Sequence, residues 1–159
     1  MEIIYHPIGI VHSPFQQLEG MPIQPAGAAK TRGSIELLPE FAAGLQDIEG
    51  FSHLILLYHF HQVQETQLLV TPFLDSRPHG IFATRAPKRP NPIGLSVVKL
   101  LGRTGNILHI EQVDLLDGTP LLDIKPYVPE FDRPRAARVG WLEQARGQVR
   151  HKKSDNRFR

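Results

Sequence analysis

The chain has 159 residues, enough for one domain with a core, and its 41% hydrophobic and 21% charged residues are typical of globular proteins. The 18 Lys and Arg residues and 16 Asp and Glu residues give a net charge of +2, and the lack of cysteine excludes disulfides and thiolate chemistry. No apolar run approaches the roughly 18 residues of a membrane helix, and no signal-peptide pattern begins the chain, so we expect a cytoplasmic protein without membrane contacts.

The first half of the chain is predicted to contain three strands and one long loop. Residues 2–11 are rich in Ile, Val and Tyr and predict a strand, whereas residues 15–30 contain prolines and glycines without a lasting period and predict a loop. A loop of that length in a compact domain is often functional. Residues 32–38 alternate as a second strand, and residues 39–45, which begin with Pro, suit one or two helical turns. Residues 51–60 are dense in aromatic and aliphatic side chains, which predicts a buried strand.

The second half is predicted to alternate proline-rich loops with strands. Residues 72–92 read as a loop that a short strand at residues 80–83 interrupts. Three further strands are predicted at residues 95–101, 107–113 and 120–127, the first two joined by a turn at residues 102–105. Only residues 139–149 have a helical pattern, and it is weak.

Short strands joined by Pro- and Gly-containing turns, with almost no long helix, favour an all-β fold. A closed β-barrel leaves no strand edge exposed, so we predict a small barrel of six or seven strands. No glycine-rich turn joins a strand to a helix, which disfavours a doubly wound nucleotide-binding fold.

The positive charge is concentrated at the C-terminal end. Residues 133–159 contain nine Lys or Arg and two acidic residues, whereas residues 1–132 contain nine basic and fourteen acidic residues. We therefore divide the chain into a barrel domain, residues 1–132, and a basic extension, residues 133–159. A basic extension on a near-neutral body is a common arrangement for a nucleic-acid partner, although a solvated tail has the same composition.

The segment GIFATRAPKRPNPIG, residues 80–94, carries the cations Arg85, Lys88 and Arg89 in a loop that three prolines stiffen. Rigid loops lose less entropy when a ligand binds, and clustered Arg and Lys suit a carboxylate or a phosphate. The pattern therefore favours a ligand-binding loop over a loop whose charges serve only solubility.

The segment DLLDGTP, residues 114–120, has two interpretations. Its Asp, Gly and Pro residues are those of a tight turn before a strand. Its two carboxylates, Asp114 and Asp117, are also suited to face a ligand hydroxyl or ammonium group, and the two interpretations can both hold.

Three histidines, His53, His59 and His61, share strand parity, and His-x-His is a familiar spacing for metal ligands. A metal hydrolase or oxygenase is thus an alternative function. However, the last two end an apolar strand, where histidine often packs and forms hydrogen bonds, and we expect no metal.

Two long stretches, FATRAPKRPNPIGLS from Phe82 and DLLDGTPLLDIKPYVP from Asp114, closely resemble the TsaA-like family, which includes bacterial tRNA (adenine-N6) methyltransferases. The stretches IGIVHSP from Ile8 and FSHL from Phe51 are further matches. The resemblance runs from about residue 5 to residue 132, most of the chain, and its central motif mixes polar, Pro and Gly positions over many residues. A motif of that length and variety is too specific to be a coincidence.

The resemblance implies a β-barrel methyltransferase that binds S-adenosylmethionine and forms a homodimer. It also implies methylation of the exocyclic nitrogen of a threonylcarbamoyl-modified adenosine beside the tRNA anticodon. The matching positions imply cofactor contacts in the long first loop, at the end of the third strand and in the two motif stretches. These contacts are Pro25, Ala26, Gly27, His61, Gln62, Arg85, Leu95, Asp114, Leu115, Leu116 and Asp117.

The chemistry of methyl transfer suggests roles for some of these residues. Arg85 is the candidate for binding the methionine carboxylate of the cofactor, and Asp114 or Asp117 for an acidic group near the adenosine or the sulfonium. Asn91, which precedes Pro92, resembles the Asn of Asn-Pro pairs that hold adenine amines in unrelated methyltransferases, and is a third catalytic candidate. Transfer from a sulfonium is an in-line displacement that depends on positioning and needs neither a metal nor a covalent nucleophile.

Longer bacterial members of the family carry a further domain after the barrel, whereas here the basic extension follows. We expect this extension to contact tRNA phosphates and the barrel alone to supply the cofactor site. The candidate RNA-binding residues are Arg146, Arg150, Lys152 and Lys153, together with Lys88 and Arg89. The alternative is a barrel that binds S-adenosylmethionine or RNA without catalysis.

Overall fold

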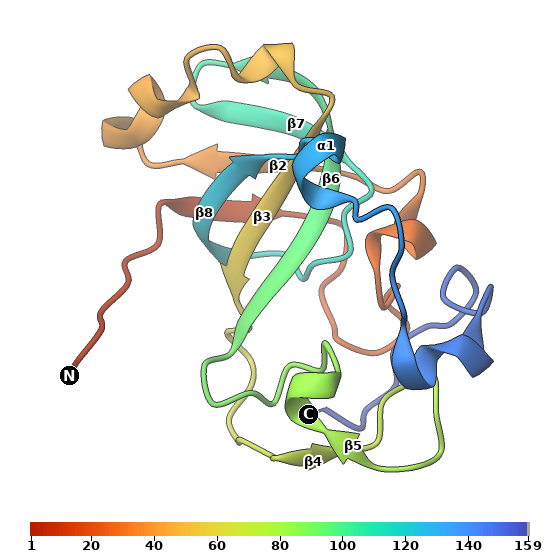
Figure 1. The fold of residues 1–159 in the computed structure, drawn as a ribbon. Coiled ribbons are helices and arrows are strands. Elements are labelled where there is room, and N and C mark those ends of the chain that lie inside the picture. The colour runs from red at the N-terminus through yellow and green to blue at the C-terminus, as the bar shows by residue number, and fades with distance from the viewer. Residues whose placement is uncertain (159) are drawn as a thin grey trace.

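Six strands pair edge to edge into a closed barrel in the computed structural model, which describes residues 1–158 and, of Pro25, only the backbone (Figure 1). Their order around the barrel is β1, β2, β7, β6, β3, β8, and every neighbouring pair is antiparallel. The strands are β1 Gly9–His12, β2 Arg32–Leu37, β3 His53–His59, β6 Ile93–Thr104, β7 Ile107–Glu111 and β8 Thr119–Pro126. The predicted all-β closed barrel is confirmed.

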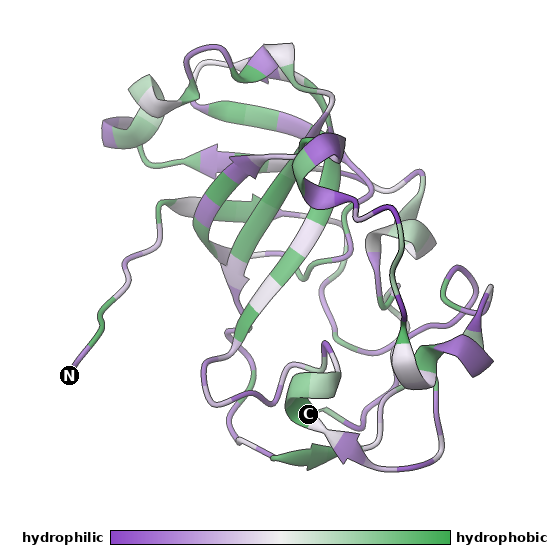
Figure 2. Ribbon diagram, in the orientation of Figure 1, coloured by the Kyte–Doolittle hydropathy of each residue, from purple (hydrophilic) through white to green (hydrophobic). Residues whose placement is uncertain are grey.

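Alternation along the strands builds the core. In β3 the side chains of Leu54, Leu56 and Tyr58 are buried and the residues between them are partly exposed, and the first part of β6 alternates in the same way. Inward-facing apolar side chains from all six strands form one cluster inside the barrel. Apolar residues concentrate on the barrel strands, and the segment after β8 is largely hydrophilic (Figure 2).

Short helical turns and a small sheet make up the rest of the described chain. The 3-10 helices are η1 Pro25–Ala28, η2 Pro39–Leu45, η3 Ile48–Gly50, η4 Ile81–Ala83 and η5 Gly140–Ala145, and the α-helix is α1 Pro129–Asp132. Strands β4 Leu69–Val70 and β5 His79–Gly80 pair with each other beyond one end of the barrel (Figure 1). A second apolar cluster contains Val70, Ile81, Ala86 and Phe158, with Phe73 packed against it.

Four predicted elements differ from the structure. The turn predicted at residues 102–105 is confined to Gly105 and Asn106, because β6 continues to Thr104. Residues 2–8 lie outside any strand, because β1 is paired with its neighbours only from Gly9 onward. Residues 81–83 form the helical turn η4 instead of a strand, since β4 pairs only with His79 and Gly80. The helical pattern at residues 139–149 produces only the six-residue η5. No helix within residues 1–158 is long and apolar enough to cross a membrane.

Candidate active site

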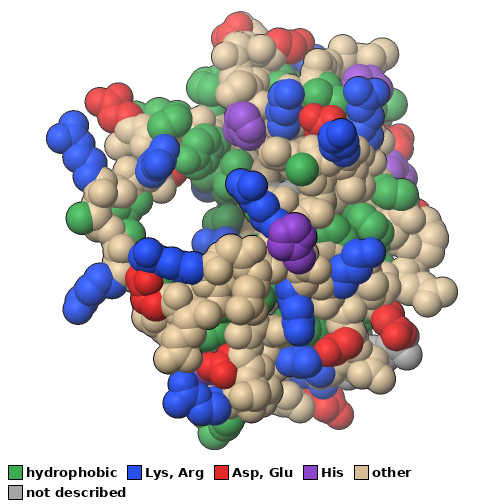
Figure 3. All heavy atoms as spheres, turned by 90° about the vertical axis from the view of Figure 1, so that its right-hand side faces the viewer, with side chains coloured by type: hydrophobic (Ala, Val, Ile, Leu, Met, Phe, Trp, Pro, Cys, Tyr) green, Lys and Arg blue, Asp and Glu red, His purple; other side chains and the backbone are tan. Residues whose placement is uncertain are grey.

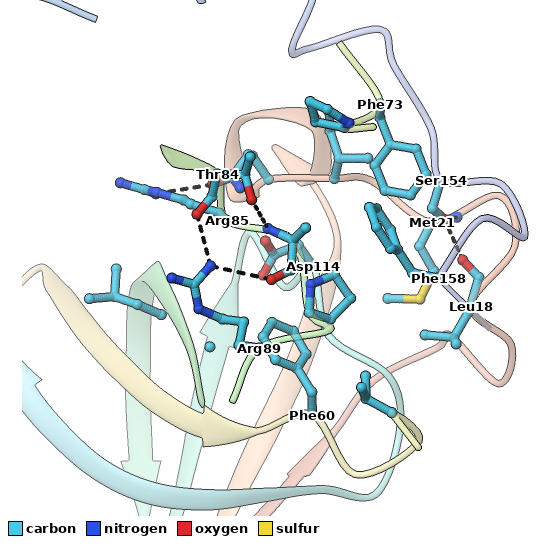
Figure 4. Close-up of a pocket in the computed structure, with 18 of the residues that line it drawn as sticks. Leu18, Met21, Phe60, Phe73, Thr84, Arg85, Arg89, Asp114, Ser154 and Phe158 are labelled. Carbon is cyan, nitrogen blue, oxygen red and sulfur yellow. Dashed lines mark hydrogen bonds between the residues drawn. The ribbon is translucent and has the colours of Figure 1, made fainter. Parts of the chain in front are cut away.

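A cavity of about 800 Å³ lies between one end of the barrel and the C-terminal segment, residues 133–158. Its lining side chains come from five parts of the sequence, within residues 18–24, 58–63, 72–95, 114–119 and 141–158. Phe73, Phe158 and Met21 lie on one side of it and Arg85 and Arg89 on another (Figure 4). The barrel therefore does not form this cavity alone, because residues of the C-terminal segment also line it.

A hydrogen-bond chain from inside the barrel ends in Asp114, whose carboxylate lines the cavity. Ser96 Oγ donates to Asp114 Oδ1 at 2.7 Å, and the Tyr58 hydroxyl lies 3.0 Å from Ser96 Oγ. Burial raises the pKa of Asp114 to about 6, although the hydrogen bond from Ser96 and the positive charge of Arg85 favour its ionised form. Burial, and next the charge of Asp114, raise the pKa of Tyr58, which therefore stays a neutral donor. Asp114 can thus exchange a proton close to neutral pH.

Local backbone features hold this chain in place. Strands β3 and β8 shift register between Leu57 and Tyr58, and such a bulge re-aims the side chains beside it. Gly94 on β6 lies against the Tyr58 ring, and any Cβ at this position would overlap the ring, so the close approach requires glycine. After β7 the chain turns through Gln112, which has a left-handed φ of 69°, and then reaches Asp114.

Arg85 and Arg89 both line the cavity but differ in how they are held. Arg89 Nη1 donates at 3.1, 2.8 and 3.4 Å to the backbone carbonyls of Ile81, Thr84 and Ala86. Its guanidinium therefore braces the loop from within. Arg85 is exposed and donates from Nη1 to Gln24 Oε1 at 3.3 Å, and its charge reaches Asp114. Arg85 is the better placed of the two to receive an anionic group of a ligand.

Aromatic side chains form part of the apolar wall. Phe60 follows β3 and packs edge-on against Tyr58, with ring centroids 5.4 Å apart. Trp141 donates from Nε1 to Ala83 O at 2.8 Å and stacks on His79 with centroids 4.5 Å apart. Rings held in this way offer flat apolar surfaces suited to a purine.

The C-terminal segment is fastened beside the cavity by hydrogen bonds and by an aromatic anchor. Ser154 N donates to Met21 O at 2.7 Å, and Ser154 Oγ donates to Leu18 O. Phe158 is buried and packs edge-on against Phe73, with centroids 5.1 Å apart. The segment thus connects the first loop with the region of β4 and β5, and it closes one side of the cavity.

The cavity brings together seven of the predicted cofactor contacts, namely His61, Gln62, Arg85, Leu95, Asp114, Leu115 and Leu116. Ala26 and Gly27 lie in η1, Asn91 lies in a bend before β6, and Asp117 lies in a turn. None of these four residues is among those that line the cavity. Pro25 begins η1, and its side chain is outside the described part of the structure. Of the three catalytic candidates, Asp114 is the one that lines the cavity.

Asp117 holds a turn. Its Oδ1 accepts a hydrogen bond from Ser13 N at 3.0 Å and lies 3.6 Å from His12 Nδ1. The bond from Ser13 is the main cause that lowers the pKa of Asp117, which therefore stays ionised. The turn interpretation of the segment fits Asp117, and the ligand-facing interpretation fits Asp114.

The predicted RNA-contacting cations differ in exposure. Lys88 is only 6% exposed, and Arg89 braces its loop, so neither presents a fully exposed charge. In the C-terminal segment Arg146 pairs with Glu143 at 2.7 Å. The exposed cations there include Arg150, Lys152 and Lys153. Lys and Arg side chains gather on the face of the molecule that includes this segment (Figure 3).

The histidine pattern does not produce a metal cluster. His53 and His59 lie on the outward side of β3, and His59 and His61 both line the cavity. Within residues 1–158 there is no group of three or more His, Cys, Asp or Glu side chains arranged to hold a metal ion.

Sequence patterns did not identify Tyr58, Trp141 and Phe158, which line the cavity, or Ser96, which donates to Asp114. Tyr58 and Ser96 occupy inward positions of β3 and β6, and a polar residue within an otherwise apolar alternation is the signal that marks such positions. Trp141 and Phe158 lie in the basic extension, where the composition indicates only charge. Nothing local in that extension predicts that it folds back onto the barrel.

Comparison with known proteins gives a family match for most of the chain. Residues 10–133 match the model of the tRNA-methyltransferase O N-terminal domain. A probable S-adenosyl-L-methionine-binding protein of Pyrococcus abyssi is 56% identical over 156 residues, which cover 98% of this chain and 85% of that protein. The tRNA (adenine(37)-N6)-methyltransferase of Escherichia coli is 38% identical over 151 residues, which cover 89% of this chain and 64% of that enzyme.

The fold has solved counterparts as well. A crystal structure of TrmO from Pseudomonas aeruginosa matches with a TM-score of 0.75 and 43% sequence identity, and the match covers 89% of this chain. It covers 63% of the Pseudomonas chain. This chain therefore spans less than two thirds of that protein and of the Escherichia coli enzyme.

Proposed function

The chain belongs to the family of tRNA-methyltransferase O N-terminal domains, and we propose from this membership that it is an S-adenosylmethionine-dependent methyltransferase acting on N6 of an adenosine in tRNA. One observation carries the proposal: a single cavity contains an exposed guanidinium, Arg85, and a carboxylate with a pKa of about 6, Asp114. The similar enzyme of Escherichia coli is named for the corresponding reaction at adenine 37.

The cavity fits S-adenosylmethionine in size and in chemistry. Its volume of about 800 Å³ is within the usual range for small-molecule sites. Arg85 would bind the methionine carboxylate, and Asp114 supplies negative charge for the ammonium or sulfonium group. The aromatic wall that includes Phe60 and Trp141 suits the adenine ring. When bound, the cofactor supplies an electrophilic methyl group.

Asp114 is the proposed proton acceptor. An exocyclic nitrogen that gains a methyl group must lose a proton, and a carboxylate with a pKa of about 6 is largely ionised at neutral pH and still able to accept one. Asn91 and Asp117 lie away from the described lining and have no proposed part in this step.

The finer substrate assignment is a threonylcarbamoyl-modified adenosine beside the anticodon, and it rests on the resemblance to the TsaA-like family. A carbamoyl group on N6 delocalises the lone pair of that nitrogen into its carbonyl. Such a nitrogen is a weak nucleophile until its proton leaves, so this substrate has particular need of a base such as Asp114.

We propose a homodimer whose interface lies beside the cavity. Ile93 and Leu95 line the cavity yet are 37% and 43% exposed, so apolar surface continues from its mouth to the outside of β6. A second copy that covers this surface would bring a symmetric contact close to the site. Light scattering should give about twice the chain mass of 17.9 kDa, and a monomer mass at micromolar concentration would contradict the dimer.

The C-terminal segment is the proposed contact for tRNA phosphates, through Arg146, Arg150, Lys152 and Lys153. They share a segment with Trp141 and Phe158, which line the cavity, so RNA held there would lie close to the cofactor. A tRNA substrate also implies that the enzyme works in the cytoplasm.

The experiment that tests the proposal is transfer of a labelled methyl group from S-adenosylmethionine to total tRNA, followed by nucleoside analysis. We expect label in an N6-methylated adenosine from wild-type protein and none from Asp114→Asn. The alternative, a barrel that binds the cofactor or RNA without catalysis, accords with names such as that of the Pyrococcus protein. Cofactor binding without any transfer would favour that alternative.

A further inference from the structure

We infer that Ser96 and Tyr58 are positioning residues for the proton acceptor Asp114, a role that rests on the proposed methyltransferase function. The two side chains are 1% and 6% exposed and lie at inward positions of β6 and β3, where the neighbouring inward residues are apolar. A polar group in such a core costs stability unless it forms hydrogen bonds. Both hydroxyls are satisfied through a chain that runs to Asp114 and so to the cavity.

The chemistry of the groups determines the order of protons along this chain. An ionised carboxylate can only accept hydrogen bonds, so the Ser96 hydroxyl uses its one hydrogen to donate to Asp114 Oδ1. Ser96 Oγ then has only lone pairs for Tyr58, so the Tyr58 hydroxyl donates to Ser96. Tyr58 keeps its proton because burial disfavours the phenolate. Each hydroxyl in the chain therefore donates toward the cavity.

Ser96 thus holds Asp114 at Oδ1, and Oδ2 is the oxygen that the inference assigns to the substrate. In the reaction the N6 proton passes to Asp114 as the N6–CH3 bond forms and the CH3–S bond breaks, which leaves a neutral thioether and a protonated carboxyl. The hydrogen bond from Ser96 favours the ionised carboxylate before transfer, against the effect of burial. The charged and titratable groups that act on Asp114 are Arg85, from the loop after η4, and Tyr58, from β3.

A carboxyl-carbon NMR titration of the ligand-free protein tests the chain directly. Ser96→Ala removes a hydrogen bond to the charged form of Asp114, so the titration midpoint of Asp114 should rise by about one pH unit. Ser34→Ala, the same change on β2, is the matched control and should leave the midpoint unchanged. Tyr58→Phe keeps the ring and should raise the midpoint by a smaller amount.

The pH dependence of methyl transfer to tRNA is the second readout. In Ser96→Ala the acidic limb of the pH–rate profile should move to higher pH by about one unit, the same shift as in the NMR titration. At pH values well below the Asp114 midpoint, the rate should therefore fall about tenfold. The rate recovers as the pH rises, and the KM for the cofactor changes little. The double variant Ser96→Ala/Tyr58→Phe should shift no further than Ser96→Ala, because both hydroxyls act through one chain.

An unchanged Asp114 titration in folded Ser96→Ala overturns the inference, whether or not the protein methylates tRNA. A loss of rate that is equal at every pH would assign Ser96 a purely structural role and also overturn it. If Ser96→Ala does not fold, the Asp114 titration in Tyr58→Phe tests the inference instead. A raised midpoint supports the hydrogen-bond chain, and an unchanged midpoint overturns it. If wild-type protein transfers no methyl group, the proposed function fails, while the NMR titration still reports on the hydrogen-bond chain.

Discussion

At the scale of single residues, two aspartates three positions apart have opposite electrostatic environments. Asp117 is stabilised as an anion by the backbone N–H of Ser13, which lowers its pKa. Asp114 is placed where burial raises its pKa to about 6. Titratable groups whose environments separate their pKa values in this way are common at active sites. The sequence segment DLLDG shows both carboxylates but not which of them is desolvated.

The raised pKa of Asp114 predicts that its ionised carboxylate destabilises the folded protein at neutral pH. Its folded pKa of about 6 exceeds the ordinary 3.8, so the folded state binds more protons between those values and stability falls as the pH rises through them. Asp114→Asn removes the charge and keeps an acceptor for Ser96. We expect it to increase the free energy of unfolding at pH 7 by about 1–2 kcal/mol. At about pH 3, below both pKa values, the difference from wild type should nearly vanish.

Urea denaturation at the two pH values measures this effect. Asp117→Asn is the matched control, because the pKa of Asp117 is lowered and its charge is stabilising. That variant should be destabilised at pH 7. If Asp114→Asn is destabilised at pH 7, as Asp117→Asn should be, Asp114 is not desolvated as described.

Arg85 is predicted to bind the cofactor carboxylate. Arg85→Ala should weaken S-adenosylmethionine binding by about 1.5–3 kcal/mol, the scale of a hydrogen bond to a charged group. Arg85→Lys keeps the positive charge but loses the planar guanidinium with its paired donors, so its affinity for the cofactor should lie between those of wild type and Arg85→Ala. Titration calorimetry measures all three proteins, and Arg32→Ala, on the outside of β2, is the control with unchanged affinity. If folded Arg85→Ala binds S-adenosylmethionine with wild-type affinity, Arg85 does not bind the cofactor.

At the scale of elements, the barrel was predictable from sequence and the wall that the C-terminal segment adds was not. Strands β2, β3, β6, β7 and β8 follow local sequence properties, such as the alternation in β2 and the dense run of aromatic and aliphatic side chains in β3. The position of the C-terminal segment depends on contacts of Ser154 with Leu18 and Met21, more than 130 residues away. No periodic pattern encodes such contacts. The motif loop and Asp114 were found because their residue types carry chemistry of their own.

Phe158 is predicted to anchor that segment. It is buried against Phe73, so Phe158→Ala leaves a cavity and should free the segment from the region of β4 and β5. We expect faster amide exchange at residues 140–158 and cofactor affinity reduced several-fold, with the barrel still folded. Phe131→Ala is the control, because Phe131 is 79% exposed. Unchanged exchange and affinity in Phe158→Ala would mean that the segment does not need this anchor.

At the scale of the whole molecule, charge is divided between a near-neutral barrel and a basic C-terminal segment that also lines the cavity. We predict that reversing the charges of Arg146, Arg150, Lys152 and Lys153 weakens tRNA binding and flattens its salt dependence. Each lost phosphate contact should reduce the slope by about 0.7–0.9. S-adenosylmethionine affinity should stay close to wild type, because none of the four lines the cavity.

Filter binding across a salt series measures this slope. Reversal of Lys99 and Lys125, two exposed cations on the outside of the barrel, is the control and should leave the slope nearly unchanged. If the four reversals have no effect and the control does, the barrel face and not the C-terminal segment contacts tRNA.

In the proposed reaction the cofactor and the reacting nitrogen meet in the cavity between the barrel and the C-terminal segment. A crystal structure of the protein with S-adenosylmethionine tests it most directly. We predict the methionine carboxylate at Arg85, the adenine against the aromatic wall and the methyl group facing the space beside Asp114. A cofactor bound elsewhere, or bound with its methyl group turned away from Asp114, would contradict the account.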